Sequence, residues 1–228
     1  MQKVKLSQEG LKIIACVTML VDHIGAVLVP SMALRVIGRL SFPIFCFLLA
    51  EGAHYTKNRK AYGRRLLLGM ILAEIPFDLL FFGRITWEHQ SVMVTLLLGF
   101  LYAVAMSSFS AMGHRLMLLV PFAFLGELLH CDYGGWGVAM IGLFVITRDV
   151  PNRRLCQALC LGLLGWVLGG RMIHIGPLEF PRQVLCVAAM IPICLYDGQK
   201  KSDQLWVRRM FYLFYPVHLL VLYVVRRI

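Results

Sequence analysis

The residues most suited to chemistry in this sequence are ionisable side chains that stand inside long apolar stretches. Asp22 and His23 lie in the stretch LKIIACVTMLVDHIGAV. An ionisable group in hydrocarbon costs at least about 2.5–3.5 kcal/mol on insertion scales, so a chain that keeps one there has a use for it. The other groups of this kind are Arg39, Glu51, Glu74, Asp78, Glu127 and His218.

His23 is the candidate general base, because the ordinary pKa of histidine lies close to neutral pH. Successive residues of a helix point about 100° apart, so Asp22 and His23 are predicted to serve different partners. The alternative interpretation is a neutral histidine that only bonds to a neighbouring helix.

Two arginines follow in the segment RVIGRLSFPIF. Arg35 and Arg39 are four residues apart and share one helix face, and Gly38 allows a neighbouring helix or a ligand to approach the backbone. Arg39 could pair with Asp22 across the first helical hairpin, or hold an anionic donor group through its two-pronged guanidinium. The sequence leaves both possibilities open.

Glu74 and Asp78 are four residues apart in the segment AEIPFD. Two carboxylates on one face repel each other unless they are protonated or bound to a cation or a donor. Arg64, Arg65 or a backbone group is the predicted partner of Glu74. Asp78 is predicted to be solvated near the outer surface.

The most basic segment, Lys57–Arg65, follows a predicted helix that carries Glu51. Together with Glu51, its residues Lys60, Arg64 and Arg65 are candidates for binding a nucleotide cofactor through its phosphates. The alternative is a topology anchor at an anionic leaflet of the membrane.

Other catalytic templates are missing from the sequence. No P-loop, GxGxxG, HExxH or GxSxG motif occurs. The seven cysteines form no CxxC pair and no ligand-spaced cluster with histidine, so they are interpreted as small apolar core residues, and no metal site is predicted.

The elements that must position these side chains are membrane helices. The sequence is 59% hydrophobic and 15% charged, whereas soluble domains are nearer half apolar and a quarter charged. We expect an all-α polytopic bundle of about nine membrane helices, forming a single domain over residues 1–228. The predicted helices cover residues 10–29, 34–55, 64–83, 91–108, 113–131, 134–148, 153–170, 181–196 and 206–226.

Charge indicates the orientation of this bundle. The formal net charge is +11, and most of the Lys and Arg residues fall in the segments that are cytoplasmic if the N-terminus is cytoplasmic. This bias is the positive-inside pattern, so the N-terminus is predicted to be cytoplasmic and the basic charge is not interpreted as nucleic-acid binding.

The order of several segments resembles the TraX family of bacterial membrane proteins, named for the protein that acetylates the N-terminus of F-pilin. The resemblance runs from Leu11 to Leu222. It rests on the segments LKIIACVTMLVDHIGAV, RVIGRLSFPIFCFLLAEGAHYTKN, AEIPFDLLF, SVMVTLLLGF, DYGGWGV and FYLFYPVHLLVL. The family is similar in turn to a wider superfamily of transmembrane acyltransferases.

This resemblance implies an acetyltransferase of the bacterial inner membrane. Acetyl-CoA, or another acyl-CoA, would bind from the cytoplasm, and the acceptor at the outer face would be a peptide N-terminus, a glycan or a lipid-linked molecule. His23 occupies the position of the expected catalytic histidine, and Arg39 that of the superfamily's arginine. Tyr215 and His218 match its closing tyrosine-proline-x-histidine pattern. Nothing in the sequence indicates a pilus, so the pilin substrate is not carried over.

Acyl transfer needs a base and hydrogen-bond donors for the developing oxyanion, which His23 and Arg39 would supply, with Asp22 beside them. Thr95 and Tyr215 are further candidate donors. A small proton-coupled transporter would also bury ionisable groups, but no repeated halves are evident. A non-catalytic scaffold would leave the buried groups unexplained.

Overall fold

The computed structural model describes residues 5–199 and 205–228, and it is predominantly helical. The chain forms two compact units, one of residues 1–48 and 152–214 and the other of residues 49–151 and 215–228. Two helices, α3 and α10, contribute residues to both units. No observation tests the prediction of a single domain over residues 1–228, which stays a prediction.

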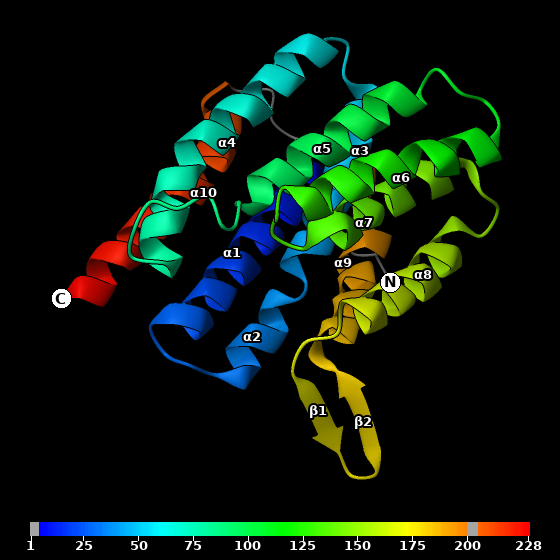
Figure 1. Cartoon of the computed structure of the whole chain (residues 1–228). Coiled ribbons are helices and arrows are strands. Elements are labelled where there is room, and N and C mark those ends of the chain that lie inside the picture. The colour runs from blue at the N-terminus through cyan, green and yellow to red at the C-terminus, as the bar shows by residue number, and fades with distance from the viewer. Residues whose placement is uncertain (1–4, 200–204) are drawn as a thin grey trace. The chain divides into compact units, whose positions relative to one another are not determined.

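The first unit combines the N-terminal helices with a segment from the last third of the chain. α1 and α2 lie side by side in it (Figure 1), and η2 packs against α8. Its elements are α1 (Gln8–Val27), α2 (Met32–Gly38), the beginning of α3 (Ser41–Tyr55), α8 (Arg153–Leu168), β1 (Met172–Ile175), β2 (Leu178–Pro181), the 3₁₀ helix η2 (Arg182–Ala189), α9 (Met190–Cys194) and the beginning of α10 (Leu205–Arg227).

The second unit is built around α5, which packs against α4, α6 and α7. Its most deeply buried side chains include Tyr102, Leu80 and Ile141. Its elements are the end of α3, α4 (Arg59–Phe81), α5 (Val92–Met106), α6 (Met112–Leu128), α7 (Gly134–Ile146), the 3₁₀ helix η1 (Thr147–Asp149) and the end of α10.

Small residues set the close approach of α1 and α2. A β-carbon on Gly25 would lie 2.6 Å from the β-carbon of Leu34, and one on Gly38 would overlap with the side chain of Asp22. Glycine is therefore required at both positions, and the predicted role of Gly38 in admitting a neighbouring helix is confirmed.

The second predicted helix, 34–55, is divided at residues 39 and 40 into α2 and α3. Pro43 has no backbone N–H, so the carbonyl of Arg39 cannot accept the helical hydrogen bond from that position. The backbone N–H of Arg39 bonds to the carbonyl of Val36 at 3.1 Å, which closes α2 with a tighter turn. Arg39 therefore stands at the end of a helix.

The chain between α8 and α9 departs from the all-α prediction. Residues 172–181 form an antiparallel hairpin that extends beyond the end of α8 (Figure 1), and most of the predicted helix 181–196 is the 3₁₀ helix η2. Gly176 has φ +58° and is followed by Pro177 in the two-residue loop. This glycine–proline pair is a turn signal, and it lies between the predicted helices 153–170 and 181–196.

Three helices among the described residues are long and apolar enough to cross a membrane: Gln8–Val27, Met32–Tyr55 taken through its break, and Arg209–Arg227. The others of the predicted set are shorter or more polar. The 15 residues of α5, for example, extend about 22 Å, whereas the hydrocarbon core is about 30 Å thick.

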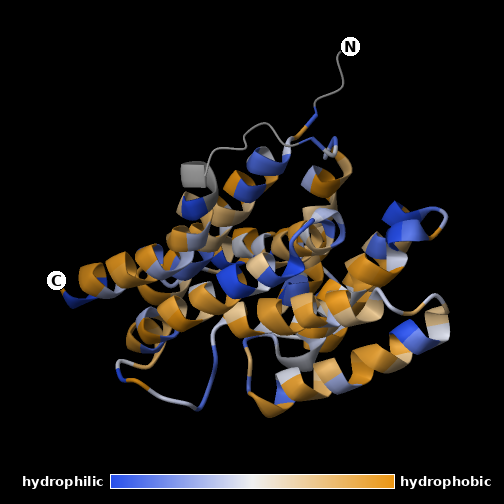
Figure 2. Cartoon of the chain, turned by 90° about the horizontal axis from the view of Figure 1, so that it is seen from above, coloured by the Kyte–Doolittle hydropathy of each residue, from blue (hydrophilic) through white to orange (hydrophobic). Residues whose placement is uncertain are grey.

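Much of the helical ribbon is coloured as hydrophobic in Figure 2, and many apolar side chains on the helices are exposed. Water rarely faces such long stripes in soluble proteins, whereas hydrocarbon would cover them without cost. Each residue of the two clearest stripes is more than half exposed and recurs at helical spacing: Leu68, Ile71, Leu72 and Ile75 on α4, and Leu155, Leu159, Leu163 and Trp166 on α8.

Candidate functional site

A buried ion cluster joins α1 to the end of α2. Nη1 of Arg35 lies 2.6 Å from Oδ2 of Asp22, and Nη2 of Arg39 lies 2.6 Å from Oδ1. Asp22 is 9% exposed and Arg39 is 6% exposed. The predicted pairing of Asp22 with Arg39 across the first helical hairpin is confirmed, and Arg35 joins it.

Arg39 also reaches a residue from the distant end of the same unit. Its Nε donates to the carbonyl of Arg35 at 3.0 Å, and its Nη1 donates to Oε1 of Gln183 at 2.8 Å. Gln183 belongs to η2. Gln183 was not among the predicted site residues, because a neutral amide in an apolar stretch lacks the signal that an ionisable group gives there. Asp22, Arg35, Arg39 and Gln183 are called the Asp22 cluster below.

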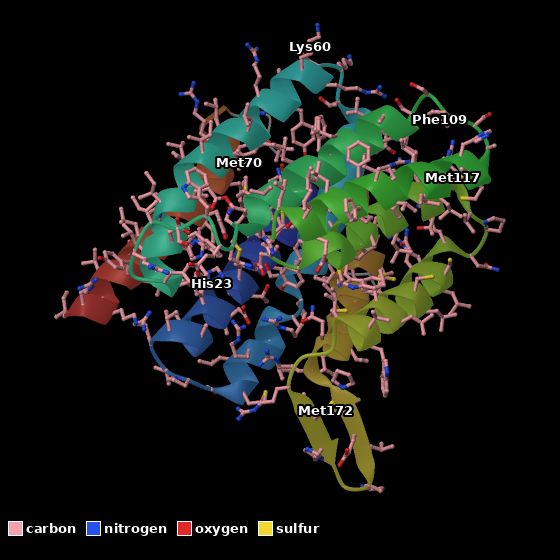
Figure 3. The ribbon with its side chains drawn as sticks, in the orientation of Figure 1. His23, Lys60, Met70, Phe109, Met117 and Met172 are labelled. Carbon is pink, nitrogen blue, oxygen red and sulfur yellow. The ribbon has the colours of Figure 1, made fainter. Side chains whose placement is uncertain are left out.

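His23 follows Asp22 on α1 and is half-buried; Figure 3 marks it on that helix. Both carboxylate oxygens of Asp22 accept from arginines, and the prediction that His23 serves a different partner stays a prediction. The Asp22 cluster ties the stretch of α1 that carries His23 to the end of α2.

In the second unit Glu51 pairs with a residue that was not predicted as its partner. Nη1 of Arg148 lies 2.7 Å from Oε1 of Glu51, and both side chains are 15% exposed. The guanidinium of Arg148 also lies over the ring of Tyr55 at 4.7 Å. The charge of Glu51 is therefore compensated inside the protein, and its predicted role in cofactor binding stays a prediction.

The basic candidates lie on a helix rather than in a loop. α4 begins at Arg59, five residues earlier than predicted, because Oδ1 of Asn58 accepts from the backbone N–H of Ala61 at 2.8 Å. This places the exposed side chains of Lys60, Arg64 and Arg65 on the first two turns, and Figure 3 marks Lys60 there. Cations at a helix N-terminus oppose the helix dipole, whereas an anion there is favoured.

The far end of α4 carries the two buried carboxylates. Oε1 of Glu74 accepts from the hydroxyl of Ser91 at 2.8 Å, and the backbone N–H of Ser91 also bonds to this carboxylate. The predicted backbone partner of Glu74 is thus confirmed. Asp78 is 3% exposed and accepts from the backbone N–H of Thr86 at 2.9 Å. The prediction that Asp78 is solvated is wrong, because the loop after α4 folds back over it.

The loops before α5 and before α7 pair through Gln90 and Cys131. The hydroxyl of Thr95 donates to the carbonyl of Asp132 at 2.6 Å, and Nε2 of His89 lies 4.0 Å from Oδ1 of Asp132. The Asp132 carboxylate raises the pKa of His89, while partial burial acts in the opposite direction. Burial raises the pKa of the Cys131 thiol to about 11, so this cysteine is a structural thiol.

The proton of Thr95 is engaged by that carbonyl, and a role for Thr95 as a catalytic donor stays a prediction. Tyr215 and His218 are both buried in α10, with ring centroids 5.5 Å apart in an edge-to-face arrangement. His23, Asp22 and Arg39 belong to the first unit, whereas Tyr215 and His218 belong to the second. Within residues 5–199 and 205–228, no group of three or more His, Cys, Asp and Glu side chains could hold a metal ion.

Long apolar helices with apolar outer faces and buried ionisable residues define a helical protein of the membrane class. Comparison with protein families then identifies it further. Residues 7–226 match the TraX protein family, so the chain belongs to the TraX family.

Two relatives extend this assignment. The chain is 28% identical over 237 residues to a protein of Dichelobacter nodosus named as probable fimbrial assembly protein FimC, serogroup H1, and the match covers 97% of this chain and 96% of that protein. It is 30% identical over 157 residues to the uncharacterized protein RP591 of Rickettsia prowazekii (strain Madrid E), which covers 65% of this chain and 59% of that protein. No solved structure matches the chain.

Proposed function

We propose that this TraX-family protein is an integral membrane acetyltransferase, with His23 as the general base. The observation that carries the proposal is the Asp22 cluster, in which the buried guanidinium of Arg39 and the partly exposed guanidinium of Arg35 pair with Asp22, the residue before His23. Acyl transfer needs a proton acceptor close to positive charge, because the carbonyl oxygen under attack becomes negative. Membership of the TraX family makes acetyl transfer the reaction to test.

The reaction follows from these groups. Nε2 or Nδ1 of neutral His23 takes the proton from the acceptor amine or hydroxyl as the nitrogen or oxygen attacks the thioester carbonyl carbon. The oxyanion that forms is stabilised by the guanidinium of Arg39. Collapse of the oxyanion breaks the carbon–sulfur bond, and the departing CoA sulfur receives the proton from His23. No covalent intermediate on the enzyme is required.

The donor side of the proposal rests on Lys60, Arg64 and Arg65. These exposed cations stand on the first turns of α4, where free backbone N–H groups also favour anions. The phosphates of acetyl-CoA, or of another acyl-CoA, would bind there from the cytoplasm. Glu51 at the end of α3 and Tyr215 and His218 on α10 remain secondary candidates for contact with the reactants.

For topology we propose a multi-pass protein of the bacterial inner membrane with a cytoplasmic N-terminus. The positive-inside bias of the sequence supports this orientation. The acceptor would be an amine or hydroxyl at the outer face, on a peptide N-terminus, a glycan or a lipid-linked molecule. Because one relative is named as a fimbrial assembly protein, the N-termini of surface-filament subunits belong among the acceptors to be tested.

The test is transfer of labelled acetyl groups from acetyl-CoA to envelope components, measured per folded molecule. His23→Ala should lower the rate by about 10²–10⁴-fold, because a positioned base is lost, while acetyl-CoA binding and folded yield stay close to wild type. His114→Ala is the matched control, since His114 is an exposed histidine at the start of α6. Near-normal turnover of folded His23→Ala would remove His23 from the mechanism.

A further inference from the structure

The amide of Gln183 is the least satisfied polar group of the Asp22 cluster. Gln183 is 6% exposed, and its Oε1 accepts from Nη1 of Arg39. Its Nε2 is buried and has no hydrogen-bond acceptor among the described residues. A buried N–H without an acceptor is costly, and native proteins rarely keep one unless it has a use.

The direction of this amide is chemically determined. A guanidinium has only donors, so the atom of Gln183 that faces Arg39 must be the oxygen. Turning the amide over would place two donors against each other. Nε2 must therefore point away from Arg39, and its two N–H bonds are directed at whatever lies on the other side of the amide.

The charges of the Asp22 cluster also favour a ligand that accepts hydrogen bonds. Two guanidinium groups share the single carboxylate of Asp22, so positive charge exceeds negative charge by one within the cluster. Within the described residues, the side-chain hydrogen bonds of Arg35 are made through Nη1, and its side chain is 26% exposed. Surplus donors together with surplus positive charge fit an oxygen ligand that carries negative charge.

Gln183 is also held in place by its own backbone. Its N–H bonds to the carbonyl of Gly169 at 3.3 Å. A β-carbon on Gly165 of α8 would lie 2.6 Å from the carbonyl oxygen of Gln183, so α8 packs directly on this part of η2. A donor fixed in this way before a ligand arrives loses little freedom on binding, which is the property of an effective oxyanion site.

We infer that the Asp22 cluster is a binding site for one negatively charged oxygen, in which Nε2 of Gln183 donates the hydrogen bond and Arg39 supplies the charge. The ligand class is a carboxylate or the oxyanion that develops from a carbonyl group. Anion binding stands without the proposed function. The further step, that Gln183 stabilises the oxyanion of the thioester during acetyl transfer, rests on it.

The experiment measures the thermal unfolding midpoint of the purified full chain with sodium acetate and with acetamide, its neutral analogue, at matched ionic strength. Acetate at roughly ten times its dissociation constant should raise the wild-type midpoint by about 3 °C, and acetamide should not. Gln183→Leu removes the donor and should abolish the response. Gln183→Glu should abolish it too, because the new carboxylate pairs with Arg39. Arg39 keeps an acceptor at position 183 in this variant, so the protein should still fold.

Gln157→Leu is the control, since Gln157 is a second buried glutamine of the same unit and accepts from Arg154 at 3.3 Å. It should respond to acetate as the wild type does. A wild type that is indifferent to acetate, or an unchanged response in folded Gln183→Glu, would overturn the inference.

Turnover then separates this inference from the proposed function. If both hold, Gln183→Leu lowers kcat for acetyl transfer by about 10²–10³-fold, the typical loss for one oxyanion donor, with little change in KM for acetyl-CoA. An acetate response in a protein that neither binds nor uses acetyl-CoA would leave the anion site standing and refute the acetyltransferase. Normal turnover in Gln183→Leu would refute the catalytic role of Gln183.

Discussion

At the scale of single residues, the polar groups of the first unit are organised by charge pairing. Asp22 is the only acidic member of the Asp22 cluster, and it pairs with two arginines. Arg35 lies within the short helix α2, and Arg39 directly follows its last residue. Asp22 is therefore a structural residue of the cluster, and its role is distinct from the one proposed for its neighbour His23.

Removing the carboxylate should therefore act on stability. Asp22→Ala leaves the buried guanidinium of Arg39 and the partly exposed guanidinium of Arg35 without their counter-charge, and breaking a buried pair costs about 3–5 kcal/mol. We expect a sharply reduced folded yield and unfolding midpoint, measured on purified protein. Glu88→Ala is the control, because the Glu88–Arg84 pair is about 70% exposed on both sides, where ion pairs contribute at most about 1 kcal/mol. Equal effects of both substitutions would contradict this account.

The chemistry-bearing residues were the most predictable part of the site. The pairing of Asp22 with Arg39 was one of the two possibilities that the sequence left open. It could be proposed because a charge inside an apolar stretch needs an opposite charge nearby, and the first helical hairpin brings these two residues together. Gln183 could not be found in this way, because a neutral amide gives no such signal and its partner is 144 residues away. The pairing of Glu51 with Arg148 was also not predicted, since Arg148 lies 97 residues further along the chain in the 3₁₀ helix η1.

At the scale of elements, the α1–α2 hairpin depends on backbone approach. Gly38 brings the end of α2 against the side chain of Asp22, with no room for a β-carbon. The sequence could predict both helices and this contact. It could not predict the 3₁₀ form of η2, because residues 184–196 are almost all apolar and the length of that stretch favoured an α-helix.

Gly38→Ala should therefore disturb the site although it adds a single methyl group. The new β-carbon would displace Asp22 from its arginines, and overpacking of this kind typically costs about 1–3 kcal/mol. Gly113→Ala is the matched control, since nothing lies within 4 Å of that position on α6; there alanine should be neutral or stabilise by up to about 1 kcal/mol. The thermal unfolding midpoints of the two variants test this expectation. A Gly38→Ala midpoint equal to that of the wild type would contradict the close contact between Gly38 and Asp22.

The loops before α5 and α7 give a prediction about pH. Asp132 raises the pKa of His89 above its ordinary value, so the folded protein binds this proton more tightly than the unfolded chain. The stabilisation is complete below the ordinary pKa of about 6.5 and is lost as pH rises through the higher folded value. The unfolding midpoint should fall as pH rises above the ordinary pKa of His89, and Asp132→Asn should flatten this part of the profile. An identical slope in that variant would exclude the pair as its cause.

At the scale of the whole molecule, apolar outer faces and basic helix ends fit a membrane protein. Lys60 stands at the start of α4 and Arg84 in the loop beyond its end. The 23 residues of α4 extend about 34 Å, which is enough to cross a hydrocarbon core of about 30 Å. The orientation proposed above then places Lys60 in the cytoplasm and Arg84 outside.

Labelling with a membrane-impermeant thiol reagent tests this orientation. Arg84→Cys should react in intact cells, whereas Lys60→Cys should react only after permeabilisation, because a charged reagent cannot cross the apolar core. The wild-type protein, with its seven cysteines, sets the background, and replacing the exposed Cys194 by serine lowers it in both variants alike. Both positions are exposed, so a difference between them reports the side of the membrane rather than burial. Reaction of Lys60→Cys in intact cells would place the basic turns of α4 outside, and cytoplasmic acetyl-CoA could not then be bound there.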